Sequence, residues 1–126
     1  MHDVIPNAAQ ARIDPRKLRD YALNREHSSG RYKAEYFAPM GYTADNWQRL
    51  ERDIREQLLI QPALPGRESP FGRKYVINAP LQGPQGELRY VTTVWIIRPS
   101  NEYPELVTIF PEDRPEEPND EDAPAT

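Results

Sequence analysis

The stretch Glu87-Leu-Arg-Tyr-Val-Thr-Thr-Val-Trp-Ile-Ile-Arg98 decides the fold class of this chain. It is a long run of β-branched and aromatic residues, which is typical of a β-strand. One face of such a strand would carry Val91, Thr93, Trp95 and Ile97, and the other Leu88, Tyr90, Thr92, Val94 and Ile96. Because both faces are largely apolar, we expect the strand to lie at the centre of a sheet and to be partly covered on both sides.

Shorter runs on either side of this stretch predict its partners. Lys74 to Leu81 reads as a strand, joined to the central one by the turn Gly83-Pro84-Gln85-Gly86. Glu105 to Phe110 reads as a further strand after a second turn, so the three form an antiparallel meander. Residues 61–72 contain three prolines and two glycines, and we expect a connecting loop there.

Helical signals fill the first half of the chain. Asp14 is an N-cap candidate followed by Pro15, which predicts a helix to about Leu23. A second helix is expected to begin at Ser28 or Ser29 and to end by Ala38, ahead of Pro39. A third, capped by Thr43, should run to about Ile60 with apolar residues at spacings of three and four: Trp47, Leu50, Ile54 and Leu58. The sequence therefore predicts an α+β fold, with two to three N-terminal helices packed on a three- to four-stranded antiparallel meander.

Composition sets the domain organisation. The chain has 126 residues and no cysteine, so we expect one domain over residues 1–111 and exclude disulfides, thiolate metal sites and cysteine nucleophiles. Residues 112–126 are rich in acids and proline and are expected to form a disordered tail. No apolar run is long enough for a membrane span and no signal peptide opens the chain, which favours a cytoplasmic protein or an effector exported by a signal-free route.

Charge is unevenly distributed along the chain. Residues 112–126 contain seven acids against Arg114, a net charge of −6, so residues 1–111 carry +2 of the total of −4. Between Arg12 and Lys33 there are seven cations against three acids. A basic N-terminal third is compatible with a phosphate-bearing partner such as RNA, although a solvated helix face has the same composition.

The segment from His27 to Gly41 is the best candidate for a site. If Ser29 caps the second helix, the N–H groups of Gly30 and the following residues favour an anion, and Arg31 and Lys33 add positive charge beside them. His27 is the side chain best suited to exchange a proton near neutral pH. The acids before the tail are scattered and only two histidines occur, so no metal or other cofactor is expected.

Metal-free RNA cleavage is one chemistry that these residues fit. It needs proton transfer at the 2′-hydroxyl and at the leaving 5′-oxygen, together with charge stabilisation at phosphorus. His27 is assigned the proton transfer and Lys33 the phosphate, with Tyr75 and Thr93 as hydrogen-bond donors from adjacent strands. Trp95 is a candidate for stacking an unpaired base.

Each of these residues also has a structural interpretation. His27 can brace its own loop, and Lys33 can lie along the apolar side of Phe37 with its head in water. Thr93 and Tyr75 are ordinary strand residues, and Trp95 is an ordinary core residue.

Several motifs occur in a characteristic order: Ile5-Pro6-Asn7, Lys17-Leu18 with Tyr21, His27-x-x-Gly30-x-x-Lys33-Ala34-x-x-Phe37, Gly41-Tyr42-Thr43, and Thr93-Val94-Trp95-Ile96-Ile97. Over about residues 5–111 the chain thereby resembles a small bacterial family of domains of unknown function, found alone and as the terminal module of polymorphic toxins. The order of helices and then a meander is similar to that of barnase, EndoU, colicin and RelE ribonuclease toxins. This resemblance implies RNA cleavage without a metal, and a cognate antitoxin or immunity protein as a candidate partner.

Two functions from different classes follow. The first is a toxin-like, metal-independent endoribonuclease that uses His27 and Lys33. The second is a non-enzymatic interaction module, such as an immunity or accessory protein, that docks a partner through the open sheet face or the acidic tail. Charge around His27 distinguishes them, because a ribonuclease needs a positive cleft there and a mimic of nucleic acid needs a negative one.

Overall fold

The computed structural model describes residues 3–111, which form an α+β fold with a four-stranded antiparallel sheet in the order β1-β2-β3-β4. The strands are β1 (Leu64–Ser69), β2 (Gly72–Gln82), β3 (Leu88–Ile97) and β4 (Glu105–Pro111). The predicted central strand is β3, and its residues 91–96 are all buried. The meander and the position of β3 are therefore confirmed. The predicted acidic tail at 112–126 lies outside the described residues.

Three helices precede the sheet, each extended or followed by a short turn of different pitch. In chain order the elements are η1 (Ala8–Gln10), α1 (Pro15–Lys17), η2 (Leu18–Ala22), α2 (Arg31–Phe37), η3 (Ala38–Met40), η4 (Ala44–Asn46), α3 (Trp47–Asp53) and η5 (Ile54–Leu58). Asp14 caps α1 by accepting a hydrogen bond from the Arg16 N–H, as predicted. Thr43 and Asn46 form a capping box ahead of α3, which confirms that helix start.

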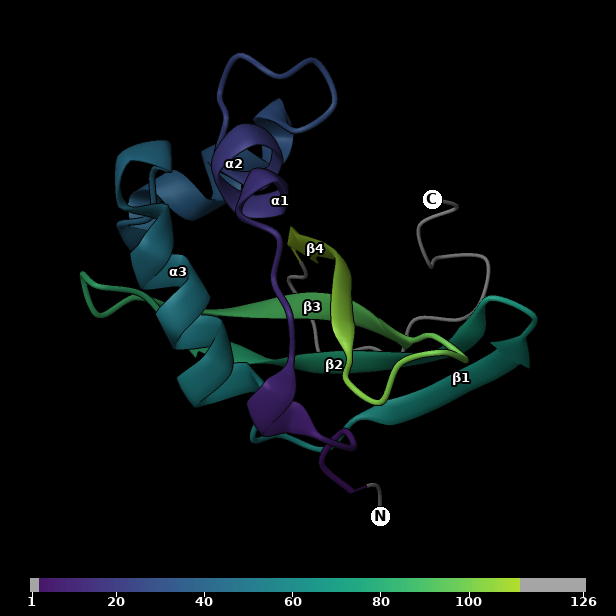
Figure 1. Ribbon diagram of the computed structural model, residues 1–126. Helices are drawn as coiled ribbons and strands as arrows, with labels where there is room; N and C mark the ends of the chain where they lie inside the picture. Colours follow the sequence, from purple (N-terminus) through teal and green to yellow (C-terminus); the bar gives the residue numbers. More distant parts are fainter. Residues whose placement is uncertain (1–2, 112–126) are drawn as a thin grey trace.

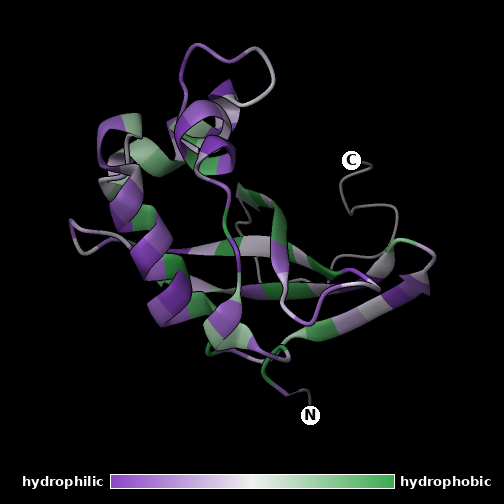
Figure 2. Ribbon diagram, viewed as in Figure 1, coloured by the Kyte–Doolittle hydropathy of each residue, from purple (hydrophilic) through white to green (hydrophobic). Residues whose placement is uncertain are grey.

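The helices gather on one side of the sheet (Figure 1). In Figure 2 the outer surface of α3 is hydrophilic, while β2 and β3 carry hydrophobic residues along their length. The core between the two layers includes Phe37, Leu50 and Ile54 from the helices and Ile77 and Trp95 from the sheet. Burial of these side chains is the main force that holds the two layers together.

The expected loop at residues 61–72 is wrong, because this segment contains β1. Pro65 and Gly66 lie inside the strand, and both residues normally argue against one. β1 tolerates them because it is an edge strand with a shift in register between Pro65 and Glu68. The proline and glycine content of this segment is typical of a loop, but the segment contains an edge strand that pairs with β2.

The opposite edge of the sheet, β4, is partly covered by the N-terminal segment. The Arg12 N–H donates to Pro104 O at 2.8 Å, and the Leu106 N–H donates to Arg12 O at 2.9 Å. Arg12 thus forms a parallel bridge with Glu105. This pairing brings α1, which begins at Pro15, next to the second half of β4.

Within residues 3–111 no helix is long and apolar enough to cross a bilayer. This finding concerns the described part of the chain alone.

Candidate functional site

A pocket of about 670 Å³ lies where α1, η2 and the start of α2 meet β4. The residues that line it come from the two ends of the described chain: Asp14, Arg16, Lys17, Tyr21, His27, Ser29, Lys33, Val107 and Thr108. The predicted pair, His27 and Lys33, therefore shares one pocket.

Lys33 is the most unusual residue of the pocket because its side chain is buried, with only 4% of the residue exposed. Its Nζ donates to Thr108 Oγ1 at 3.2 Å and lies 4.5 Å from the centre of the Tyr21 ring. Within residues 3–111 it forms no ion pair. A buried cation without a carboxylate is costly unless another anion or a polar group compensates it.

Lys17 provides a second ammonium group in the pocket. Its Nζ donates to Val107 O at 3.0 Å, a carbonyl next to the residue that holds Lys33. Like Lys33, it has no carboxylate partner in the described part of the chain. Both lysines are thus fixed to consecutive residues of β4, and both keep N–H donors to spare.

His27 holds the loop that precedes α2. Its Nδ1 accepts hydrogen bonds from the Ser29 N–H at 3.0 Å and the Gly30 N–H at 3.1 Å. Its ring lies edge-on to Tyr21, with the ring centres 4.9 Å apart. Because two N–H groups point at Nδ1, the neutral ring carries its proton on Nε2.

The start of α2 differs from the prediction. The helix begins at Arg31, not at Ser28 or Ser29, and neither serine caps it. Instead the N–H groups of Ser29 and Gly30 are taken up by the His27 ring, so these two groups are not available to an anion. Nδ1 of His27 therefore braces the loop, as the structural interpretation of this residue expected.

Ser29, Gly30 and Arg31 were expected to bind substrate. Ser29 is exposed and lines the pocket. Gly30 is buried against Tyr21, where a Cβ would collide with the Tyr21 carbonyl oxygen, so its role is to allow close packing. Arg31 does not line the pocket and faces Glu35, with Nε 3.7 Å from Oε1.

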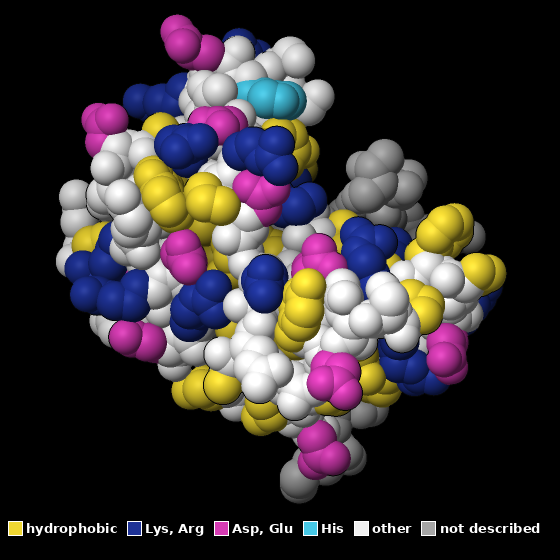
Figure 3. Space-filling model, in the orientation of Figure 1, with side chains coloured by type: hydrophobic (Ala, Val, Ile, Leu, Met, Phe, Trp, Pro, Cys, Tyr) yellow, Lys and Arg dark blue, Asp and Glu magenta, His cyan; other side chains and the backbone are white. Residues whose placement is uncertain are grey.

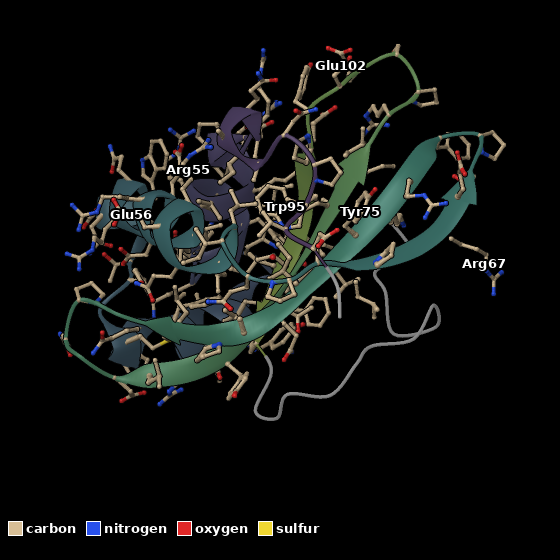
Figure 4. All side chains as sticks on the ribbon, turned by 90° about the horizontal axis from the view of Figure 1, so that it is seen from below. Arg55, Glu56, Arg67, Tyr75, Trp95 and Glu102 are labelled. Atoms are coloured by element: carbon tan, nitrogen blue, oxygen red, sulfur yellow. The ribbon has the colours of Figure 1, made fainter. Side chains whose placement is uncertain are left out.

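The sheet residues expected in the site lie elsewhere. Trp95 is fully buried and its indole N–H donates to Thr93 Oγ1 at 2.8 Å, so it cannot stack a base. Thr93 is also fully buried, and Tyr75 lies opposite Trp95 on β2. Figure 4 shows Trp95 between the sheet and the helices. None of the three lines the pocket, and Trp95 is a core residue.

Lys17, Tyr21 and Thr108 line the pocket but were not assigned to it from the sequence. Lys17 and Tyr21 lie four residues apart on the first helical segment, a spacing that places them on one face. Thr108 is 75 residues from Lys33, and no local pattern could connect them.

Comparison with known protein families gives one match. Residues 4–113 match the family model described as a domain of unknown function, DUF6883. The chain belongs to this family. No curated protein and no solved structure was found to be similar to it.

In this DUF6883 chain the rim of the pocket carries one compensated acid. Asp14 accepts from the Arg16 side chain at 2.7 Å and from its backbone N–H at 3.0 Å. These hydrogen bonds to Arg16 lower the pKa of Asp14 from its ordinary 3.8 to about 2. With three cations (Arg16, Lys17 and Lys33) against one acid, the lining has a net charge of +2 when His27 is neutral.

The part of the DUF6883 domain that the structure describes contains no group of three His, Asp or Glu side chains placed to hold a metal ion. The polar side chains of the pocket are ammonium groups, hydroxyls, an imidazole and the Arg16 guanidinium, which is paired with the Asp14 carboxylate. Such a set binds oxyanions such as phosphate and sulfate.

Proposed function

We propose that this chain is a toxin-like, metal-independent endoribonuclease whose site is the pocket between α1, α2 and β4. The observation that carries the proposal is the pair of lysines, Lys17 and Lys33. Their ammonium groups are fixed to neighbouring residues of β4, and within residues 3–111 neither meets a carboxylate. A phosphodiester is the natural counter-charge for two such groups.

Charge stabilisation would be the main catalytic contribution. When the ribose 2′-oxygen attacks phosphorus, negative charge grows on the phosphate oxygens until the 5′-oxygen leaves and a cyclic 2′,3′-phosphate remains. Lys17 and Lys33 are already held in place, so they can stabilise this charge without reorganising. The Thr108 hydroxyl, which accepts from Lys33, can donate its own proton to a phosphate oxygen.

The proposal gives different roles to His27 and Lys33. Nδ1 of His27 is occupied, so the ring acts as a neutral Nε2–H donor to a substrate oxygen. Lys33 then protonates the leaving 5′-oxygen, while solvent accepts the proton of the 2′-hydroxyl and later restores the ammonium. This assignment replaces the expectation that His27 transfers the proton.

Two features support this proposal over a non-enzymatic interaction module. The pocket around His27 is positive, with three cations against Asp14, which fits a ribonuclease and not a nucleic-acid mimic. The resemblance to toxin modules points in the same direction. A cytoplasmic RNA target and a cognate antitoxin or immunity protein belong to the same proposal.

The test is cleavage of a single-stranded RNA by the purified protein in the presence of EDTA. We expect a cyclic 2′,3′-phosphate product and no cleavage of an oligonucleotide that lacks the 2′-hydroxyl. Lys33→Met, which keeps the apolar stem and removes the charge, should lower kcat by about 10² or more. Lys17→Met should also lower it.

Lys74→Met is the matched control, because Lys74 lies on β2 and does not line the pocket. It should cleave at the wild-type rate. Equal rates for Lys33→Met and the wild type would show that any cleavage comes from elsewhere, and binding of RNA without cleavage would favour an interaction module.

A further inference from the structure

A second cationic feature lies on the same edge of the sheet, outside the pocket. Arg12 is exposed, and the main-chain pairing of its segment with β4 fixes its position. Its guanidinium carbon lies 4.6 Å from the centre of the Tyr103 ring. The two side chains form a stacked pair at the start of β4, on the loop whose outer part Glu102 marks in Figure 4.

Arg12 is not neutralised by an acid in the described part of the chain. Two acids close to it in the fold, Glu105 and Asp14, are engaged elsewhere. Glu105 accepts from Arg98 Nε at 3.2 Å and from Asn101 at 3.1 Å, and Asp14 is paired with Arg16. The positive charge of Arg12 is therefore available to a ligand.

Three cations that have no acid partner among the described residues follow β4 in order. Arg12 is bridged to Glu105, Lys17 holds the Val107 carbonyl and Lys33 holds the Thr108 hydroxyl. Glu105 and Thr108, the first and last of these β4 residues, are three positions apart, which is roughly 10 Å along a strand. Lys and Arg side chains lie over α1 and along the segment that leads to it in Figure 3.

We propose that the outer edge of β4 is the track for a single RNA strand, and that Arg12 with Tyr103 forms a subsite for a nucleotide next to the one cleaved. This inference rests on the proposed function and adds the substrate class, which is unpaired RNA longer than a dinucleotide. A phosphodiester binds Lys17 and Lys33, and the neighbouring base stacks on the guanidinium plane of Arg12.

The chemistry of the pair favours an unpaired strand. Bases that are free of a duplex stack on aromatic rings and on Arg guanidinium planes, whereas bases inside a helix do not present their faces. Arg supplies a flat face and a charge together, which Lys does not. Tyr103 holds the guanidinium over its ring and so positions this group before the ligand arrives.

The experiment separates binding from cleavage. A fluorescent single-stranded RNA hexamer of mixed sequence with 2′-O-methyl groups cannot be cleaved and reports binding by anisotropy. We expect Arg12→Gln and Arg12→Lys each to weaken its binding about 10-fold, and Tyr103→Leu to weaken it as well.

Arg25→Gln is the control, because Arg25 is exposed and does not line the phosphate pocket. It should bind the hexamer as the wild type does. Unchanged hexamer binding by Arg12→Gln would rule out the proposed RNA track. So would a wild-type affinity for a blunt RNA duplex equal to that for the hexamer. If the hexamer binds as expected but no RNA is cleaved, the track stands and the proposed ribonuclease activity falls.

Discussion

Lys33 is a charged residue held inside the protein by a hydroxyl and an aromatic ring. The same ring, Tyr21, lies edge-on to His27, so one side chain supports both residues that the sequence singled out. Removal of His27 should therefore affect folding as well as any chemistry. We expect the hydrogen bonds of the His27 ring to contribute to the free energy of unfolding.

His27→Ala removes the acceptor of the Ser29 and Gly30 N–H groups. Loss of a comparable helix cap costs about 1 kcal/mol, which lowers the melting temperature by about 4 °C. Ser28→Ala, at an exposed neighbouring position, should leave the melting temperature unchanged. In the wild type, ¹⁵N NMR of the neutral ring should find the proton on Nε2, and a proton on Nδ1 would contradict the assignment.

Asp14→Asn tests the charge of the cap that precedes the pocket. The pKa of Asp14 is lowered to about 2 from 3.8, so its ionised form stabilises the fold above pH 3.8 and this contribution disappears as the pH falls through 2. The side chains are exposed, at 37% for Asp14 and 76% for Arg16, so the effect is below about 1 kcal/mol. The wild type should melt above the variant at pH 6, and the gap should close by pH 2. A gap that is constant from pH 6 to pH 2 would refute the ion-pair contribution.

Residue-level reasoning from the sequence placed His27 and Lys33 in a common pocket, because both lie in one short segment around a helix start. It did not find Thr108 or Lys17, whose contacts join residues 75 and 90 positions apart. Trp95 and Thr93 drew attention as reactive types, but their depth in the sheet depends on how the helices cover it. The chemistry of a side chain follows from the residue type, whereas its burial depends on which distant elements pack over it.

At the level of elements, helix caps and strand periods predicted most of the fold. Asp14 and Thr43 mark helix starts, and β2, β3 and β4 begin and end within two residues of their expected limits. The start of α2 and the existence of β1 were missed. No side chain caps α2, and a histidine ring instead binds the two N–H groups just before it. In β1, the edge position and a register shift accommodate Pro65 and Gly66.

Gly30→Ala tests how α2 is seated against η2. A Cβ at this position would collide with the Tyr21 carbonyl oxygen, so the start of α2 must shift and carry Lys33 away from the Tyr21 ring. We expect a loss of about 1 to 3 kcal/mol of stability and weaker binding of the 2′-O-methyl RNA hexamer. Gly66→Ala on β1 is the matched control, where the Cβ would lie 3.3 Å from Lys74 O, and it should leave hexamer binding intact. Thermal unfolding and anisotropy measure the two effects, and wild-type values for Gly30→Ala would show that the contact is not tight.

For the molecule as a whole, the proposed RNA surface is one edge of the sheet together with the helix that lies beside it. Three cations follow this edge without an acid partner in residues 3–111: Arg12, Lys17 and Lys33. Ion pairs to other arginines on the described surface, such as Arg49 and Arg98, reduce the competing attraction elsewhere. RNA binding should therefore depend on salt as expected for a few specific phosphate contacts.

With about three cations placed against the RNA strand, the logarithm of the association constant should fall with the logarithm of the salt concentration at a slope of about −2. Anisotropy of the 2′-O-methyl hexamer, measured from about 50 to about 300 mM salt, gives this slope. Lys33→Met should flatten it by about 0.7, and Lys74→Met should leave it unchanged. A wild-type slope near zero would mean that the ligand is not held through its phosphates.

The pocket joins the beginning of the described chain to its end, since Lys17 and Lys33 are held by Val107 and Thr108. During translation the N-terminal helices leave the ribosome before β4 does. Until β4 has emerged, the strand that holds the two lysines is missing. A nascent chain would thus remain harmless to the messenger and the ribosomal RNA around it. On the proposed function, catalytic competence is postponed until β4 has been made and has folded against the helices, by connectivity alone.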